Sequence, residues 1–512
     1  MLLLLACSPP FPDAQRWSPG HGDTATDTDS HDSTPDSSDT DDTGDSGDTG
    51  TTSVPPGADP QRWTVATRTV SSTVFTWFTT TTGQLSGPWR PLEGRDAWTG
   101  ETEWWKGQVK QMMCANLDLL YVHRIPAYDD QRVNLFRALY ELRMEGWDVP
   151  DVAPFLDPLI TWDGTTIDVT TAAGKDALAG EYIRRYEQYY SVNVDACADD
   201  WIATRDGRPV LDSWHPHLNI VGYDTLTRAD LQTRLDAALG TSHPVFHADP
   251  WMVTTAVNPT FSFSDEKDPQ FEVTEYSYSV EYNGLTVTQL KGGYWDQNVR
   301  TGSSGSILPR EGGAHFREAW ANVDASRVDR VYVESFNEYD EGSGIYAASV
   351  GPPYTTADNP SNDTWSSGAD PFEYLRTTAS GAAAFNETPT QDARVLSENL
   401  PRRGTAGSTV TATVVVRNEG DSSWTGAALY GFGEKLEDSG ADLSPTGLAR
   451  WYVDDAGDEI PTYGGIFRGR PTTFTLTLRL PDTPGSYPVS WGMLQEGVAW
   501  FGEELSYTLV VE

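Results

Sequence analysis

The spacing of apolar and polar positions changes twice along the chain, and these changes divide it into three parts. Residues 20–60 contain almost nothing apolar. From about residue 62 to 390, short apolar runs alternate with longer stretches whose apolar residues recur every three or four positions. From 393 to 512, apolar and polar residues alternate in runs that Gly, Pro and Asp separate. These patterns predict a disordered segment, an α/β domain and an all-β domain, in that order.

The middle part predicts seven strands, most of them followed by a helix. We expect strands at 72–79, 117–126, 152–158, 208–216, 243–251, 285–296 and 329–338, and helices at 101–116, 131–146, 175–190, 228–239, 313–323 and 370–384. Strand–helix pairs that run in one direction imply a parallel sheet covered by helices. An eighth strand is easily hidden in a part of this length, so a (β/α)8 TIM-type barrel over 62–390 is our prediction. A doubly wound open sheet is the alternative, although no Gly-rich nucleotide loop follows the first strand.

The last part, residues 393–512, predicts an antiparallel β-sandwich. Its stretches "VRNEGDSSWTG" and "LPDTPGSYPVSWGMLQEGVAWFGEEL" resemble the Ig-like module known as the central domain of autophagy receptors. The resemblance implies an Ig-like domain with an interaction or spacer role, and contact with cell-surface material is one such role.

The N-terminal part predicts an anchor and a stalk. "MLLLLACS" resembles the end of a bacterial lipoprotein signal, with Cys7 as the lipidated residue; an incidental apolar start is the alternative. Residues 8–61 form an Asp/Ser/Thr/Gly-rich linker, and 21–50 contain no Lys or Arg, so we expect a disordered, extended segment. The predicted location is extracytoplasmic, lipid-anchored at the bacterial cell envelope (outer membrane or surface), or secreted.

Charge and composition narrow the possible partners. The 75 acidic and 35 basic residues give a net charge of −40, which argues against nucleic acid and leaves the lipid anchor as the expected membrane contact. The 19 Trp and 22 Tyr suit either sugar stacking or large cores. If Cys7 is lipidated, Cys114 and Cys197 either pair or remain buried thiols. No cofactor motif or metal-ligand spacing is evident, so we expect neither a cofactor nor a metal.

Polar and aromatic side chains follow nearly every predicted strand of the middle part. Barrel enzymes place their chemistry at these C-terminal strand ends. We therefore expect a glycan-binding cleft, with ordinary loop packing as the alternative for each residue. The candidates are His123, Arg124, Asp212, Trp214, His215, Trp251, Tyr294, Trp295 and Asp296.

The stretch "VYVESFNEYDEGSGIY" at 331–346 begins in the last predicted strand and continues into several carboxylates. Gly342 and Gly344 favour a turn, which would make Glu338 and Glu341 neighbours because they are three residues apart. Two close carboxyls do not both ionise easily, so one pKa rises and one group keeps its proton. This is the acid/base division of glycoside hydrolysis. A solvated acidic loop is the alternative.

Alternation along the same strand gives a second expectation. Tyr332, Glu334 and Phe336 should share one face of the strand. Glu334 lies inside the strand, so we expect it to support the carboxylate pair rather than belong to it.

The element "VYVESFNEYDEGSGI" is similar to "ITSFNEWHEGTQI" of glycoside hydrolase family 99, the endo-α-mannosidases. "DGRPVLDSW" and "LPREGGAHFREAWANV" are similar to two further blocks of that family, in the same order. The resemblance implies a retaining glycosidase of endo type that acts on α-linked glycans such as α-mannan. It matches Glu338 to the residue that assists the substrate's own 2-hydroxyl as nucleophile, through a 1,2-anhydro intermediate. It matches Glu341 to the general acid/base.

The residues around the pair depart from the family pattern. Tyr339 stands where the family has Trp, and Asp340 stands where it has His. We expect Asn337, Tyr339 and Asp340 to contact the substrate. Two further functions remain open: a surface lipoprotein that binds carbohydrate without turnover, and a polysaccharide-biosynthesis barrel that shares the N-E-W-x-E-G element.

Overall fold

The computed structural model describes residues 67–123, 129–156, 166–191, 203–205, 208–213, 220–222, 225–226, 228–239, 245–246, 280–282, 285–300, 307–351, 353, 363–444, 450–454 and 465–512. The predictions for Cys7, the 8–61 linker, Arg124, Cys197, Trp214, His215 and Trp251 lie outside the described residues. No helix in the described ranges has the length and apolar character needed to cross a bilayer.

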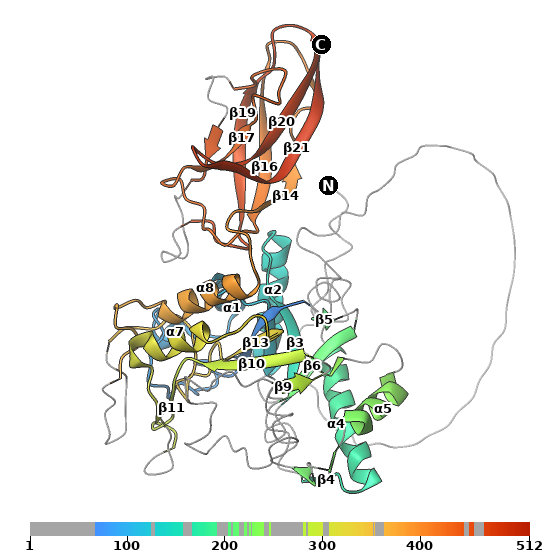
Figure 1. Cartoon of the computed structure of the whole chain (residues 1–512), viewed down its shortest axis with the longest axis vertical. Coiled ribbons are helices and arrows are strands. Elements are labelled where there is room, and N and C mark those ends of the chain that lie inside the picture. The colour runs from blue at the N-terminus through green and yellow to red at the C-terminus, as the bar shows by residue number, and fades with distance from the viewer. Residues whose placement is uncertain are drawn as a thin grey trace, which may run out of the picture.

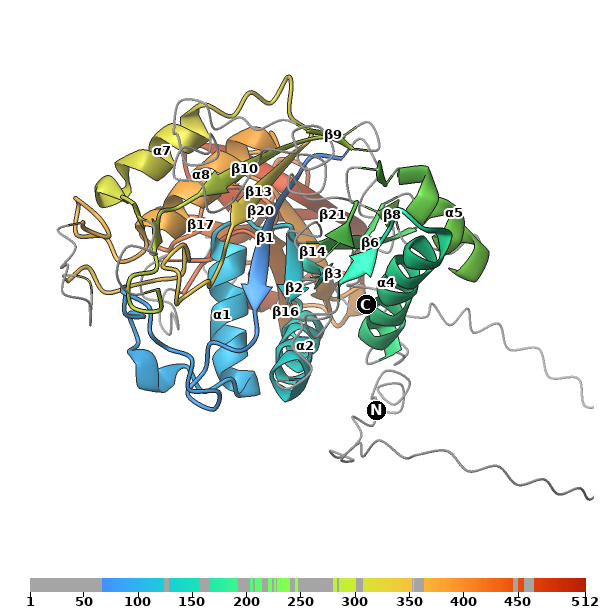
Figure 2. The same cartoon turned by 90° about the horizontal axis from the view of Figure 1, so that it is seen from below.

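A largely parallel sheet forms the centre of the first part of the molecule (Figures 1 and 2). Its strands are β1 (Thr69–Phe75), β2 (Leu119–His123), β3 (Asp151–Leu156), β5 (Thr204–Arg205), β6 (Arg208–Ser213), β8 (Val245–Phe246), β9 (Val280–Tyr282), β10 (Leu285–Lys291) and β13 (Arg330–Glu334). Each of the seven strands predicted from the sequence overlaps one of these. The short strands β5 and β9 pair antiparallel at the edges, with β6 and β10.

The neighbour order of the parallel strands is β8-β6-β3-β2-β1-β13-β10. The first strand, β1, therefore pairs with both the second strand, β2, and the last one, β13. A barrel brings its first and last strands together in this way, whereas a doubly wound sheet does not. Among the described residues β8 and β10 do not pair, so closure of a barrel is not shown.

Helices cover the outer face of the sheet. They are α1 (Thr102–Cys114), α2 (Asp129–Met144), α4 (Ala172–Ser191), α5 (Arg228–Leu239), α7 (Ala314–Ala321) and α8 (Glu373–Phe385). Helix α1 buries Trp105, Val109 and Met112, whose spacing places them on one helix face. They join one apolar cluster with outward-facing strand residues such as Val122 and Val331. Shorter elements are the turns η1 (Arg95–Ala97) and η9 (Glu311–Gly313) and the strands β4 (Ile167–Asp168), β7 (Ile220–Val221), β11 (Tyr294–Trp295) and β12 (Ile307–Leu308).

The inner face of the sheet is more polar than the outer face. Tyr121 and Tyr332 lie there in a small buried cluster. Their hydroxyls are bonded, since Arg330 donates to Tyr121 at 3.1 Å and Thr73 shares a short hydrogen bond with Tyr332. Hydrogen-bonded polar groups can be buried at little cost. The inner face therefore carries polar side chains toward the strand ends.

The expectation for Phe336 is wrong. Strand β13 ends at Glu334, so the strict alternation of faces does not extend two residues further. Phe336 is fully buried in the outer apolar cluster with Val331 and Val333, whereas Tyr332 points to the inner face. Its backbone N–H donates to the carbonyl of Thr73 at 2.9 Å.

The C-terminal part consists of two β-sheets that share one apolar core. One sheet contains β14 (Ala393–Glu398), β16 (Thr409–Asn418) and β19 (Pro471–Arg479); the other contains β15 (Arg403–Gly404), β21 (Ala499–Val511), β20 (Gly485–Gln495), β17 (Tyr430–Glu434) and β18 (Arg450–Tyr452). Val414 and Leu476 from the first sheet and Phe432 and Trp491 from the second lie in this core. The pairings are antiparallel except that between β15 and β21. The resemblance to an Ig-like module stays a prediction.

The C-terminal sandwich contacts the first part where the strands β2 and β3 begin. Phe467 is buried in the apolar cluster of the first part and packs against Trp147, with their ring centroids 5.8 Å apart. The N–H of Asp148 donates to the carbonyl of Gly469 at 2.9 Å. Figure 1 shows the sandwich beyond α1, α2 and α8. Asp148 precedes β3, so the contact lies at the end of the sheet opposite to the strand ends where barrel enzymes act.

Candidate active site

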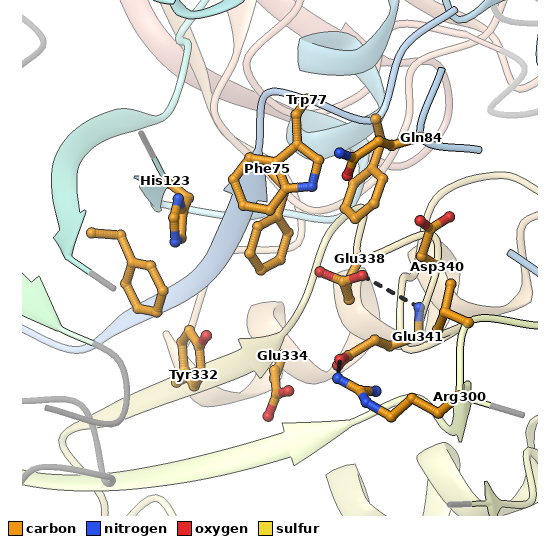
Figure 3. Close-up of a pocket in the computed structure, with 13 residues that line it drawn as sticks. Phe75, Trp77, Gln84, His123, Arg300, Tyr332, Glu334, Glu338, Asp340 and Glu341 are labelled. Carbon is orange, nitrogen blue, oxygen red and sulfur yellow. Dashed lines mark hydrogen bonds and ion pairs between the residues drawn. The ribbon is translucent and has the colours of Figure 1, made fainter. Parts of the chain in front are cut away.

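A pocket of about 360 Å³ lies at the carboxyl ends of β1, β2, β3 and β13 (Figure 3). Its lining combines aromatic rings with carboxylates. The lining residues are Phe75, Trp77, Phe78, Gln84, His123, Phe155, Val299, Arg300, Tyr332, Glu334, Glu338, Asp340 and Glu341. A ring surface opposite polar groups is the usual composition of a small-molecule site, and it suits a sugar ring, which has both apolar and hydroxyl faces.

The predicted turn after β13 is present and carries both glutamates. The N–H of Gly342 donates to the carbonyl of Tyr339 at 3.1 Å. Gly342 has φ +61°, and a Cβ there would lie 2.9 Å from Cγ of Pro88, so the position suits glycine alone. Within the turn, the N–H of Glu341 donates to Oε1 of Glu338 at 3.3 Å. The turn thus places the two residues side by side at the pocket (Figure 3).

Arg310 holds this turn from behind. Its Nη2 lies 2.7 Å from the carbonyl oxygens of both Gly342 and Gly344. The guanidinium is buried, with Trp365 and Tyr374 rings 4.3 and 4.4 Å from its Cζ. Cation–π contact and two charge-assisted hydrogen bonds make this a rigid support for the segment that carries Glu341.

Burial dominates the electrostatics of Glu338. It raises the pKa of Glu338 well above the usual range, and the nearby carboxylates of Glu341 and Asp340 raise it further. The N–H of Glu341 acts in the opposite direction but does not outweigh them. Glu338 therefore holds a proton at pH values where an exposed glutamate is ionised.

Glu334 lines the pocket and forms an ion pair with Lys291. Its Oε1 lies 2.7 Å from Nζ of the buried Lys291, and Gln289 donates a short hydrogen bond to its Oε2. Burial raises the pKa of Glu334, and Lys291 opposes that shift. The supporting role of Glu334 stays a prediction.

Glu341 is bound by a cation. Arg300 Nη2 lies 2.6 Å from Oε1 of Glu341, and the same guanidinium reaches Oδ2 of Asp296 at 2.6 Å and the hydroxyl of Tyr294 at 2.8 Å. Burial and the neighbouring carboxylates raise the pKa of Tyr294, so its hydroxyl keeps its proton. Asp296 and Tyr294 thus orient Arg300 toward Glu341.

Two of the predicted substrate contacts line the pocket. His123 packs edge-on against Trp77, with ring centroids 4.6 Å apart. Asp340 accepts a hydrogen bond from the N–H of Ser86 at 2.6 Å, and burial raises its pKa. Of Asp212 the structure describes the backbone, which pairs with Phe155.

Other predicted contacts have different roles in the structure. Tyr339 is buried among the rings of Trp98 and Tyr346, so it cannot stack on a sugar in the pocket. Asn337 uses its amide to bond the N–H and carbonyl of Phe75, both at 2.8 Å, and so fixes the loop to β1.

The "YWD" stretch also lies away from the pocket surface. Tyr294 and Asp296 are buried behind Arg300, and Trp295 is buried with them. None of the three belongs to the pocket lining, and Tyr294 and Asp296 contact Arg300, which does.

Sequence reasoning missed Arg300 and Lys291 as members of the site. Lys291 lies inside the strand predicted at 285–296, and a Lys in a strand that is expected to be buried needs a buried partner, which is a usable signal. Arg300 is a single Arg four residues after Asp296 in a loop, a pattern that carries no signal by itself. In the described ranges, no group of three His, Cys, Asp or Glu side chains is arranged to hold a metal ion.

Comparisons with known proteins give only distant similarities. No family model matches the sequence, and no curated protein matches it. Two solved structures of the GH99 endo-alpha-mannosidase from Bacteroides thetaiotaomicron are 16% and 17% identical to this chain, with TM-scores of 0.45 and 0.44, and the similarity covers 62% of this chain and 97% of theirs. A glycoside hydrolase-like protein is 13% identical, with a TM-score of 0.39, over 61% of this chain and 93% of its own.

Proposed function

We propose that this protein is a retaining glycoside hydrolase that acts on α-linked glycans, with Glu338 and Glu341 as its acid/base pair. One observation carries the proposal: Glu338 and Glu341 come from one turn at the end of β13, where the N–H of Glu341 donates to the Glu338 carboxyl, and both residues line a pocket with an aromatic wall. Of the two, Glu338 has a raised pKa and Glu341 has a cationic partner, as an acid and a base require. The motif resemblance supports α-linkage and retention.

The test is hydrolysis of a panel of α-linked glycans by the full chain. Wild type should release sugar from at least one member, and Glu338→Gln and Glu341→Gln should each reduce kcat by 10² or more. Glu318→Gln, on the exposed face of α7, is the matched control and should keep wild-type activity. Folded Glu338→Gln and Glu341→Gln variants with wild-type rates would refute the proposal.

Binding without turnover is the second candidate. It is favoured by the 2.6 Å ion pair between Arg300 and Glu341, which occupies one member of the pair. In that case the wild type binds a glycan of the same panel, and no product appears on prolonged incubation.

We further propose that the protein is anchored at the cell envelope through Cys7, with the 8–61 segment as a stalk. The apolar "MLLLLA" before Cys7 and the Asp-rich composition of the stalk support this. Palmitate labelling that persists in Cys7→Ser would contradict it. The sandwich would then be free to contact cell-surface material.

A further inference from the structure

The larger sheet of the C-terminal sandwich has a row of apolar residues on its outer face. Residues along a strand alternate between the two faces of a sheet, and Phe432 and Met493 point into the sandwich core. The residues next to them, Gly431 and Leu494, therefore point outward. The cross-strand register continues this outer row over β18, β17, β20 and β21, in the order Tyr452, Gly431, Leu494 and Trp500.

Glycines let the two aromatic rings of this row lie close to the backbone. A Cβ on Gly431 would lie 3.2 Å from Cδ1 of Tyr452, and a Cβ on Gly492 would lie 3.7 Å from Cε3 of Trp500. Each ring thus reaches over the neighbouring strand, β17 or β20. Adjacent strands are about 4.8 Å apart, so the row spans about 14 Å from Tyr452 to Trp500. We call Tyr452, Leu494 and Trp500 the aromatic platform.

The exposed apolar side chains of the sandwich gather around this same sheet. Tyr452 is 43% exposed, and Val498, in the turn between β20 and β21, is 67% exposed. Leu429 and Leu436 flank β17 and are exposed as well. Among the described residues, none of the exposed large apolar side chains lies on β14, β16 or β19, which form the other sheet. Apolar groups that gather on one face of a protein mark a binding surface.

The charged groups beside the aromatic platform are arranged in ion pairs. Cζ of Arg450 lies 4.5 Å from the centroid of the Trp500 ring, and Nζ of Lys435 lies 5.6 Å from it. Arg450 pairs with Glu496 at 3.6 Å, and Lys435 forms a short ion pair with Glu504. Because two cations face two carboxylates, the surroundings of the rings are close to neutral and contain both hydrogen-bond donors and acceptors.

Ring surfaces in neutral surroundings select among the possible occupants of this face. Nucleic acid and anionic membranes need an excess of positive charge, which the described residues of this face do not supply. A second copy of the chain would bring part of its net charge of −40 against the carboxylates. An uncharged polysaccharide meets both conditions, since the C–H faces of sugar rings pack on aromatic rings, and hydroxyls both donate and accept hydrogen bonds.

We propose that the aromatic platform is a second carbohydrate-binding site, which holds a neutral polysaccharide chain on the outer face of the sandwich. Tyr452 and Trp500 stack on sugar rings, and the paired charges beside them bond the hydroxyls. A row of about 14 Å exceeds the width of one sugar ring, so the ligand is a chain and not a single sugar. The site does not depend on the proposed hydrolysis, because the pocket lies in the first part of the molecule and the platform lies on the sandwich (Figures 1 and 3).

Affinity electrophoresis of the full chain tests the site. The native gels contain α-mannan, an α-glucan, hydroxyethylcellulose or, as an acidic polymer, alginate. At least one neutral polymer should retard the wild type, and alginate should not. Tyr452→Ala and Trp500→Ala should each weaken binding about tenfold, because each removes one stacked ring. Both variants should hydrolyse small aryl α-glycosides at the wild-type rate.

Two controls separate the platform from the rest of the molecule. Thr475→Ala, at an exposed position on the other sheet, should be retarded as the wild type is. Glu338→Gln, in the pocket, should also keep the retardation. If Glu338→Gln loses it while Tyr452→Ala keeps it, the polymer binds in the pocket and the proposal is overturned.

Three further results overturn the proposal: no retardation of the wild type by any neutral polymer, retardation by alginate alone, or wild-type affinity in Tyr452→Ala. The side chain of Tyr452 is exposed, so its replacement leaves the core intact even if Trp500→Ala fails to fold. If a neutral polymer retards the wild type but no glycan is hydrolysed, the platform stands and the proposed function fails.

Discussion

The guanidinium of Arg310 donates to the carbonyl oxygen of Gly342 at 2.7 Å, and Gly342 directly follows Glu341 in the turn. Both groups are buried. Lys could not replace Arg310 here, because its ammonium group lacks the planar set of N–H donors that bonds two carbonyls while the same plane stacks on two rings. The geometry of the turn therefore depends on a residue that lies outside the pocket lining.

Replacement of Arg310 should disturb catalysis through the turn. We expect Arg310→Lys to lower kcat on α-glycans about 10- to 100-fold with a smaller change in KM, since misplacement of a reacting group costs rate more than binding. Arg310→Ala should regain part of its kcat when guanidinium ion is added, measured by steady-state kinetics. If KM rises by the same factor as kcat falls, and guanidinium ion restores no activity, the variant is misfolded and the proposed role of Arg310 is contradicted.

Breaking the ion pair between Lys291 and Glu334 should be costly. Lys291→Met leaves a buried carboxylate without its cation, so we expect a loss of about 3–5 kcal/mol in the free energy of unfolding. The measurement is urea denaturation at neutral pH. The double variant Lys291→Met/Glu334→Leu should recover much of the lost stability, because it removes the uncompensated charge. If the stability losses of the two single variants simply add in the double variant, this expectation is contradicted.

Glu434 gives the C-terminal sandwich a pH-dependent stability. Burial raises its pKa to about 7 from an ordinary value near 4.5. As pH rises through this window, the unfolded chain loses its proton before the folded one, so stability falls between about pH 4.5 and 7. The loss should total about 2–3 kcal/mol. Thermal unfolding of the wild type and Glu434→Gln across this range should show a steeper decline in the wild type, and equal declines would contradict the assignment to Glu434.

Phe467 should couple the two parts of the molecule. It belongs to the sandwich sequence but is buried in the apolar cluster of the first part. We expect Phe467→Ala to cost about 3 kcal/mol and to separate one calorimetric transition into two. Leu436→Ala, at an exposed position, is the control. Unfolding of Phe467→Ala in the same single transition as the wild type would show that the contact does not couple the parts.

Much of the fold follows from local pattern, and the site follows only in part. Strand β13 was visible because Val331 and Val333 alternate with polar neighbours, and Glu338 and Glu341 stood out because they follow it. The face of Phe336 was misjudged because sequence alternation does not reveal where a strand ends. The sequence does not separate a sugar contact from a core residue at Tyr339, because an aromatic residue beside a catalytic candidate looks the same whether it faces the pocket or the core.

Long-range partners account for the rest. Arg300 is 41 residues from Glu341 in the sequence, and no local pattern links them. The ring contacts of Arg310 likewise join positions that only the fold brings together. Such pairs become visible only when the backbone is known.

The sandwich packs against the end of the sheet where β2 and β3 begin, and the pocket lies at the opposite end, where the strands finish. Asp148 contacts the sandwich at one end of the sheet, whereas His123 and Glu338 line the pocket at the opposite end. Material held by the sandwich and a chain being processed in the pocket would therefore occupy separate sides of the protein. A fusion partner or an immobilising support placed at the C-terminus would leave the pocket mouth unobstructed.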